Sequence, residues 1–158
     1  MALSITSPAF SNEGSIPTQY TCEGQDVSPP LEFNGAPAAA KSLALIVDDP
    51  DAPDPAAPKR VWVHWIVYNL PPTTKELPEA VSVNALPGGT RMGVNDWGKP
   101  SYAGPCPPIG RHRYFFKLYA LDTVLSDVDR PSKAALEKAM QGHVIGTATL
   151  LGTYQKTK

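Results

Sequence analysis

Apolar residues gather along this chain in short runs of the length and composition that β-strands have. The longest runs are rich in β-branched and aromatic residues, and each ends at a proline, a glycine or a polar turn. They cover Lys41–Asp49, Arg60–Leu70, Arg111–Asp122 and Val144–Tyr154. Shorter alternating pieces occur at Leu3–Thr6 and Leu31–Phe33. The pattern predicts a protein made mostly of strands.

One segment has the pattern of a helix. Ser132 suits the N-cap, the following KAALEKAMQ consists of good helix formers, and Gly142 suits the position just after the helix. We expect this helix to pack against a sheet. Two antiparallel sheets in a sandwich bury such apolar runs best. The prediction is a single domain over residues 1–158, an antiparallel β-sandwich with one or two short helices.

Strand alternation assigns side chains to faces. In the segment Arg60–Leu70, residues Trp62, His64 and Ile66 should share one face, and His64 is the only titratable group in its interior. In the segment Arg111–Asp122, His112 and Tyr114 should share a face opposite the two arginines. A lone histidine in a buried strand is most often a core residue with a satisfied hydrogen bond, so neither histidine alone indicates a site.

Composition narrows the choice of function. The chain has 158 residues, suitable for one domain, and a net charge of −1, so it lacks the basic excess of nucleic-acid-binding proteins. The longest apolar run, Leu43–Val47, is far below the roughly 18 residues that indicate a membrane span. The N-terminus has no basic, apolar leader pattern, so we expect a cytoplasmic protein. In that compartment Cys22 and Cys106 are expected to be reduced thiols.

Two loops could carry chemistry. The segment Asp48–Asp54 holds four acids and two prolines, a composition typical of a solvated turn; calcium binding is the alternative, but EF-hand spacing is missing. The segment Gly104–Gly110 (GPCPPIG) directly precedes His112. Its prolines fix the backbone, so it can lie against a small ligand at little entropic cost, or be a purely structural turn.

Several motifs in this order resemble a known family. They are YTCEGQDVSPPL at 20–31, DPDAP at 49–53, VHWIVYNLP at 63–71, GVNDWGKPSYAGPCPP at 93–108, HRYFFKLYAL at 112–121 and GHVIGTATLLGTYQ at 142–155. Together they resemble the phosphatidylethanolamine-binding protein family, in its prokaryotic Raf-kinase-inhibitor-like branch. The resemblance implies a β-sandwich with a small pocket at one end that binds phosphate, acetate or phospholipid head groups, and it implies a homodimer.

The resemblance also implies which residues form the pocket. Carried over to this chain, they are Asp49, Ala52, Pro53, Trp62, His64, Pro107, Pro108, His112 and Tyr114. We expect His64 and His112 to donate hydrogen bonds to the anion, and Asp49 to hold His64 in one tautomer and favour its cation. Anions should then bind more tightly near about pH 5.5 than near about pH 8.5. Both cysteines lie in family motifs, so a bridge between them is an alternative to two thiols.

The predicted function is therefore non-enzymatic binding of a small anion or phosphorylated ligand, without a cofactor or metal. One alternative is a protein-interaction module that inhibits a kinase or a serine protease. A further alternative is a hydrolase or metalloenzyme that uses Asp49, His64 and His112, since an Asp–His pair can act as a general base. No serine or cysteine stands in a recognisable nucleophile motif.

Overall fold

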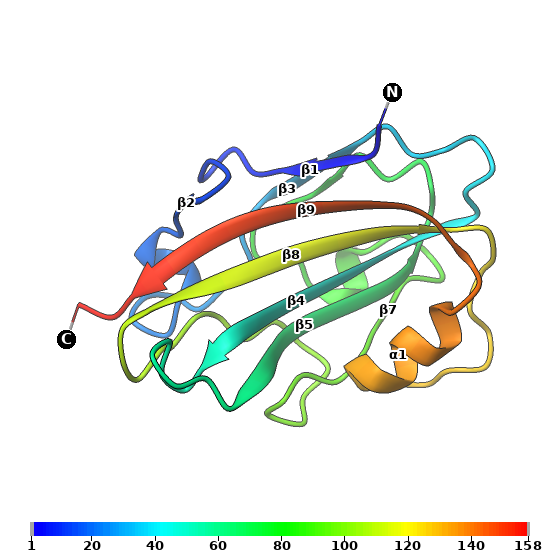
Figure 1. Cartoon of the computed structure of the whole chain (residues 1–158). Coiled ribbons are helices and arrows are strands. Elements are labelled where there is room, and N and C mark those ends of the chain that lie inside the picture. Colours follow the sequence, from blue (N-terminus) through cyan, green and yellow to red (C-terminus); the bar gives the residue numbers. More distant parts are fainter. Residues whose placement is uncertain (1, 158) are drawn as a thin grey trace.

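The computed structural model describes residues 2–157, except the Val83 side chain, and shows two sheets and a helix in layers (Figure 1). The smaller sheet has the order β1-β3-β6, which are Ser4–Thr6, Leu31–Asn34 and Glu76–Leu77. The larger sheet has the order β2-β9-β8-β4-β5-β7, which are Gly14–Ser15, Val144–Gln155, Arg111–Leu121, Ser42–Ala52, Arg60–Leu70 and Arg91–Met92. The pairs are antiparallel except β2 with β9. The predicted antiparallel sandwich is confirmed, with that one parallel pair added.

The main core lies between the two sheets. Phe33 of the small sheet and Trp65, Phe116 and Leu118 of the large sheet belong to one cluster of buried apolar side chains. Burial alternates regularly along β8, where His112 and Tyr114 point inward and Arg111 and Arg113 are exposed. This alternation confirms the predicted faces of that strand.

A second core lies on the other face of the large sheet, under helix α1 (Lys133–Met140). Leu136 and Met140 of the helix pack there with Ile66 and Tyr68 of β5. The Ser132 hydroxyl accepts a hydrogen bond from the amide of Ala135 at 3.2 Å, as expected of an N-cap. The predicted helix and its packing against a sheet are confirmed. Two 3₁₀ turns, η1 (Thr18–Tyr20) and η2 (Val83–Ala85), complete the elements, and no helix in the described part of the chain is both long and apolar enough to span a bilayer.

Strand β5 departs from simple alternation at His64. Val47 pairs with Trp65, and the next residue of β4, Asp48, pairs with Val63, so His64 is an extra residue in a β-bulge. The bulge turns Val63 and Ile66 toward the helix, while Trp65 and Val67 face the sandwich core. The expectation that Ile66 shares the face of His64 is therefore wrong, because an extra residue shifts every later side chain of the strand to the opposite face.

A disulfide joins Cys22 to Cys106, with 5.4 Å between their Cα atoms. The expected pair of reduced thiols is thus wrong, and the alternative bridge is present. Hydrogen bonds run beside it from the Cys22 amide to the Pro105 carbonyl at 3.1 Å and from the Tyr102 hydroxyl to the Tyr20 carbonyl at 2.7 Å. The bridge and these bonds fasten the N-terminal segment to the loop at 104–110.

Removing the disulfide should destabilise the protein but leave it folded. It spans a sequence separation of 84 residues, so the double variant Cys22→Ser/Cys106→Ser should lose about 2–4 kcal/mol of unfolding free energy. Urea denaturation of the oxidised protein and of the variant measures the difference. Oxidised protein treated with a dithiol reductant should reach the variant's value, and a loss below about 0.5 kcal/mol would contradict the expectation.

Candidate functional site

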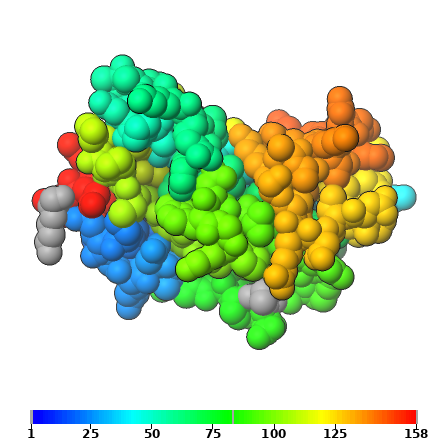
Figure 2. All heavy atoms as spheres, turned by 90° about the horizontal axis from the view of Figure 1, so that it is seen from below, coloured from blue at the N-terminus to red at the C-terminus, as the bar shows by residue number. Residues whose placement is uncertain are grey.

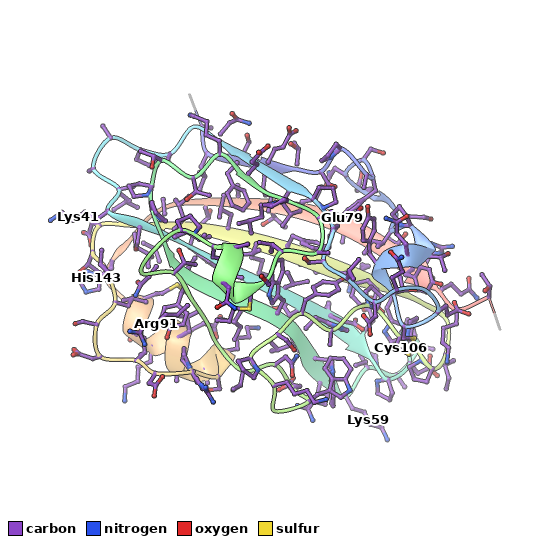
Figure 3. The ribbon with its side chains drawn as sticks, turned by 180° about the vertical axis from the view of Figure 1, so that it is seen from behind. Lys41, Lys59, Glu79, Arg91, Cys106 and His143 are labelled. Carbon is purple, nitrogen blue, oxygen red and sulfur yellow. A yellow bond between two sulfur atoms is a disulfide. The ribbon has the colours of Figure 1, made fainter. Side chains whose placement is uncertain are left out.

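The nine residues expected in a pocket all line one cavity, with a volume of about 240 Å³. Two further residues, Trp97 and Cys106, complete the lining. The cavity forms where β4 ends and where β5 and β8 begin, because these antiparallel neighbours bring Asp49, His64 and His112 to the same end of the large sheet. Figure 3 shows Cys106, which belongs to the wall, toward that end of the molecule.

Asp49 is bonded to His112. The His112 Nδ1 atom lies 2.6 Å from the Asp49 Oδ2 atom, and both residues are buried. Burial raises the pKa of Asp49, while the bond to His112 opposes that rise. The expectation that Asp49 orients His64 is wrong, because the hydrogen bond goes to the histidine on the next strand of the sheet.

Both ring nitrogens of His112 are committed. The Nε2 atom lies 2.9 Å from the Ile109 carbonyl and 3.1 Å from the Pro53 carbonyl, and a carbonyl oxygen only accepts, so Nε2 carries a proton. A second proton lies between Nδ1 and Asp49, which makes the pair neutral overall. His112 therefore positions the loops of Pro53 and Ile109, and it has no free N–H for a ligand, contrary to expectation.

His64 is the histidine with a free ring nitrogen. Its Nδ1 atom lies 2.7 Å from the Ala103 carbonyl and so donates to it, while Nε2 has no hydrogen-bond partner within residues 2–157. Burial lowers the pKa of His64 to about 4. The ring is therefore neutral at pH 7, and Nε2 offers a lone pair that accepts a hydrogen bond. The expected cationic form is wrong because burial dominates and Asp49 is bonded elsewhere.

Two residues of the cavity lining also carry a buried donor without a partner. The Trp62 indole Nε1 atom and the Tyr114 hydroxyl form no hydrogen bond with any described residue. An unpaired buried donor costs free energy, and a ligand with acceptor oxygens would remove that cost. The lining contains no lysine or arginine. The cavity thus combines donors for an oxyanion with an acceptor for one ligand proton.

Trp97, like Cys106, is a lining residue that the prediction left out. Its ring packs edge-on against His64 at 5.2 Å and Trp62 at 5.3 Å between ring centroids, and the side chain is 45% exposed. The Asn95 Oδ1 atom accepts from the amides of Trp97 and Lys99 and holds this turn. The motif GVNDWGKPSYAGPCPP contains Trp97, but its position in a loop gave no strand pattern from which to place the ring.

The acidic segment is not a solvated turn. Asp48, Asp49 and Asp51 are buried, and each binds a basic partner: Asp48 binds Lys117 and Lys133, Asp49 binds His112, and Asp51 binds Arg113. The Arg113 guanidinium holds the pKa of the Asp51 carboxyl below its usual value. Over the described range 2–157, no three His, Cys, Asp or Glu side chains are placed to hold a metal ion.

Known proteins are similar to this chain in sequence and fold. The family model of the phosphatidylethanolamine-binding proteins matches residues 6–155. An UPF0098 protein of Methanothermobacter thermautotrophicus is 50% identical over 98% of this chain and 99% of its own. The solved structure of a Chlamydia trachomatis protein described as a homologue of the family is 47% identical, with a TM-score of 0.89 and coverage of 98% of both chains.

A second solved structure agrees. The Escherichia coli protein YbcL, described as a member of the mammalian phosphatidylethanolamine-binding protein family, is 33% identical, has a TM-score of 0.88, and is matched over 100% of its chain and 99% of this one. Sequence motifs, sandwich, cavity and relatives lead to the same result: this chain belongs to the phosphatidylethanolamine-binding protein family.

Proposed function

We propose that this protein binds the phosphate group of a small phosphorylated ligand, non-enzymatically, in the cavity around His64. One observation supports the proposal: the residues that line a single cavity carry two buried donors without partners, Trp62 Nε1 and Tyr114 Oη, and the free acceptor His64 Nε2. Family membership supports an anionic ligand of the phosphate type in general.

A phosphate monoanion supplies the complementary groups. Its charged oxygens accept from the indole and the hydroxyl, and its single P–OH donates to His64. A doubly charged phosphate has no proton to give and would place an acceptor against the lone pair of His64. The neutral Asp49–His112 pair adds no net charge, so a singly charged ligand is favoured over a doubly charged one.

The Tyr114 hydroxyl gives the sharpest test of this proposal. Removing a hydroxyl that stabilises the fold lowers the unfolding free energy of the protein. Removing one that only contacts a ligand leaves the unfolding free energy unchanged. Tyr114→Phe should leave the unfolding free energy unchanged within about 0.5 kcal/mol, because the hydroxyl has no partner within residues 2–157. It should weaken phosphoethanolamine binding about tenfold or more, since a hydrogen bond to a charged group is lost. Titration calorimetry and urea denaturation measure the two quantities.

Tyr154→Phe is the matched control. The Tyr154 hydroxyl donates to Glu23, and this tyrosine does not line the cavity. Its loss should lower stability and leave the affinity for phosphoethanolamine unchanged. If Tyr114→Phe binds as tightly as the unmodified protein, the hydroxyl does not contact the ligand and the proposal fails.

A further inference from the structure

A second cavity, of about 210 Å³, lies at the β7 edge of the large sheet. Tyr68 of β5, Thr90 and Arg91 at β7, and Asp129 and Arg130 before helix α1 line it. Figure 2 shows the segments near residues 90–100 in green and near 125–135 in orange side by side on this face. In Figure 3 Arg91 lies toward the helix and Cys106 toward the other end, so the two cavities are separate.

The arginines of this cavity differ from the others in the chain. Of the five arginines, three bind protein groups: Arg60 pairs with Asp96, Arg113 pairs with Asp51, and Arg111 donates to Ser15 and Thr153. Arg91 and Arg130 have no ion pair or side-chain hydrogen bond within residues 2–157, and both line this one cavity. A guanidinium offers several N–H donors in a fork that matches oxyanions.

Hydroxyl groups beside the arginines are weakly held. The Tyr68 hydroxyl lies 3.3 Å from the Val128 carbonyl, and the Thr90 hydroxyl lies 3.3 Å from the Asn69 carbonyl. Both distances exceed the usual length of an O–H···O bond, so each hydroxyl can turn to an anion with little loss. The buried side chains of Tyr68 and Thr90 thus add two more donors to the lining.

The backbone at Arg130 is fixed in an uncommon conformation. Its φ angle is +46°, in the left-handed region, and the following residue is Pro131, which restricts the preceding residue further. The amide of Val94 donates to the Pro131 carbonyl at 2.9 Å and helps to hold the segment there. Strained backbone of this kind often occurs at binding sites, where the surrounding structure maintains it.

We propose that this cavity is a second anion site, which takes a small, fully ionised oxyanion between Arg91 and Arg130. The two guanidinium groups outweigh the single carboxylate of Asp129, so the charge of the lining is positive. The first cavity has no lysine or arginine and favours a ligand that carries a proton. The second cavity therefore selects sulfate or doubly charged phosphate, and its existence does not depend on the function proposed for the first.

Sulfate is the probe, because it carries no proton for His64 at neutral pH. Titration near about pH 7 at low salt, followed by backbone amide NMR shifts, should give saturable shifts at Arg91, Met92 and Arg130. Arg91→Gln and Arg130→Gln should each weaken sulfate binding about tenfold or more. His64→Gln should leave the sulfate affinity that is read from the shifts at Arg91, Met92 and Arg130 unchanged, because His64 does not line this cavity. This separates the site from the first cavity.

Lys75→Gln is the charge-matched control, since it removes one positive charge outside both cavities. It should keep at least about half of the sulfate affinity, because a distant exposed charge is largely screened. Shifts that do not saturate, or equal affinity in both arginine variants and the unmodified protein, would overturn the proposal. An equally large loss in Lys75→Gln would also overturn it, because binding would then follow total charge rather than this cavity.

Discussion

Phosphoethanolamine should bind this protein on the order of a hundredfold more tightly near pH 5 than near pH 8. With a pKa of about 4, His64 is neutral throughout this range. The ligand must therefore supply the proton of the hydrogen bond between itself and Nε2. The second pKa of a phosphate monoester is about 6. Above it, the form of the ligand with a singly charged phosphate group becomes about tenfold scarcer with each pH unit, and the affinity falls in proportion. Titration calorimetry across this range measures the profile.

Ethanolamine O-sulfate is the matched control ligand. It carries one negative charge and no titratable hydroxyl, so it can bond to Nε2 only when His64 itself is protonated. Its affinity should keep rising below about pH 5, toward the pKa of His64 near 4, where that of phosphoethanolamine is already level. His64→Gln should flatten both profiles, because an amide can donate or accept. Equal phosphoethanolamine affinity at both pH values, with intact folding, would refute the role of His64.

His112→Ala should cost about 3–5 kcal/mol of unfolding free energy, the largest loss expected from one substitution at the site. The change leaves the buried Asp49 carboxylate without its 2.6 Å partner and opens the contacts to the carbonyls of Pro53 and Ile109. Urea denaturation near about pH 7 measures the loss. The double variant Asp49→Ala/His112→Ala should be less destabilised than the sum of the two single variants, because it leaves no unpaired charge.

The unfolding free energy that His112→Ala loses should be larger at neutral pH than at acidic pH. Burial raises the pKa of Asp49 in the folded protein above the unfolded value of about 3.9. The stability that its protonated form contributes is complete below the unfolded pKa and is lost as pH rises through the folded pKa. Without His112, which opposes that rise, the folded pKa moves further up. His112→Ala should therefore be closest to the unmodified protein near about pH 4 and furthest from it near about pH 7. An additive double variant, or a loss independent of pH, would contradict this account.

How much the sequence predicts depends on whether local pattern decides the outcome. Alternation places His112 and Tyr114 correctly because β8 pairs with β9 without a break from Arg111 to Ala120. It fails for Ile66 because the bulge at His64 depends on the register with β4, which no pattern within β5 reveals. Helix α1 is predictable because its cap and its helix formers are local features.

For the candidate site, the sequence predicts the lining residues but not their hydrogen bonds. Its membership follows from family motifs, and the cavity brings those residues together. Its hydrogen bonds do not follow from motifs, because which histidine meets Asp49 depends on positions that differ by a few ångströms across neighbouring strands. The pairing of Cys22 with Cys106 depends on how the N-terminal segment folds back over the loop. The expectation of reduced thiols is wrong because it rested on an assumed compartment and not on this contact.

The bulge at His64 divides strand β5 into two parts with separate roles. Before it, Trp62 lines the ligand cavity and Val63 packs under the helix; after it, Trp65 packs in the sandwich core and Ile66 packs under the helix. Because the bulge separates the cavity end from the rest of the strand, substitutions at the cavity end can change the shape of the cavity while the later residues keep their pairing with β4. Substitution at Trp62 can therefore alter the ligand cavity of this chain while the packing of Trp65 and Ile66 stays the same.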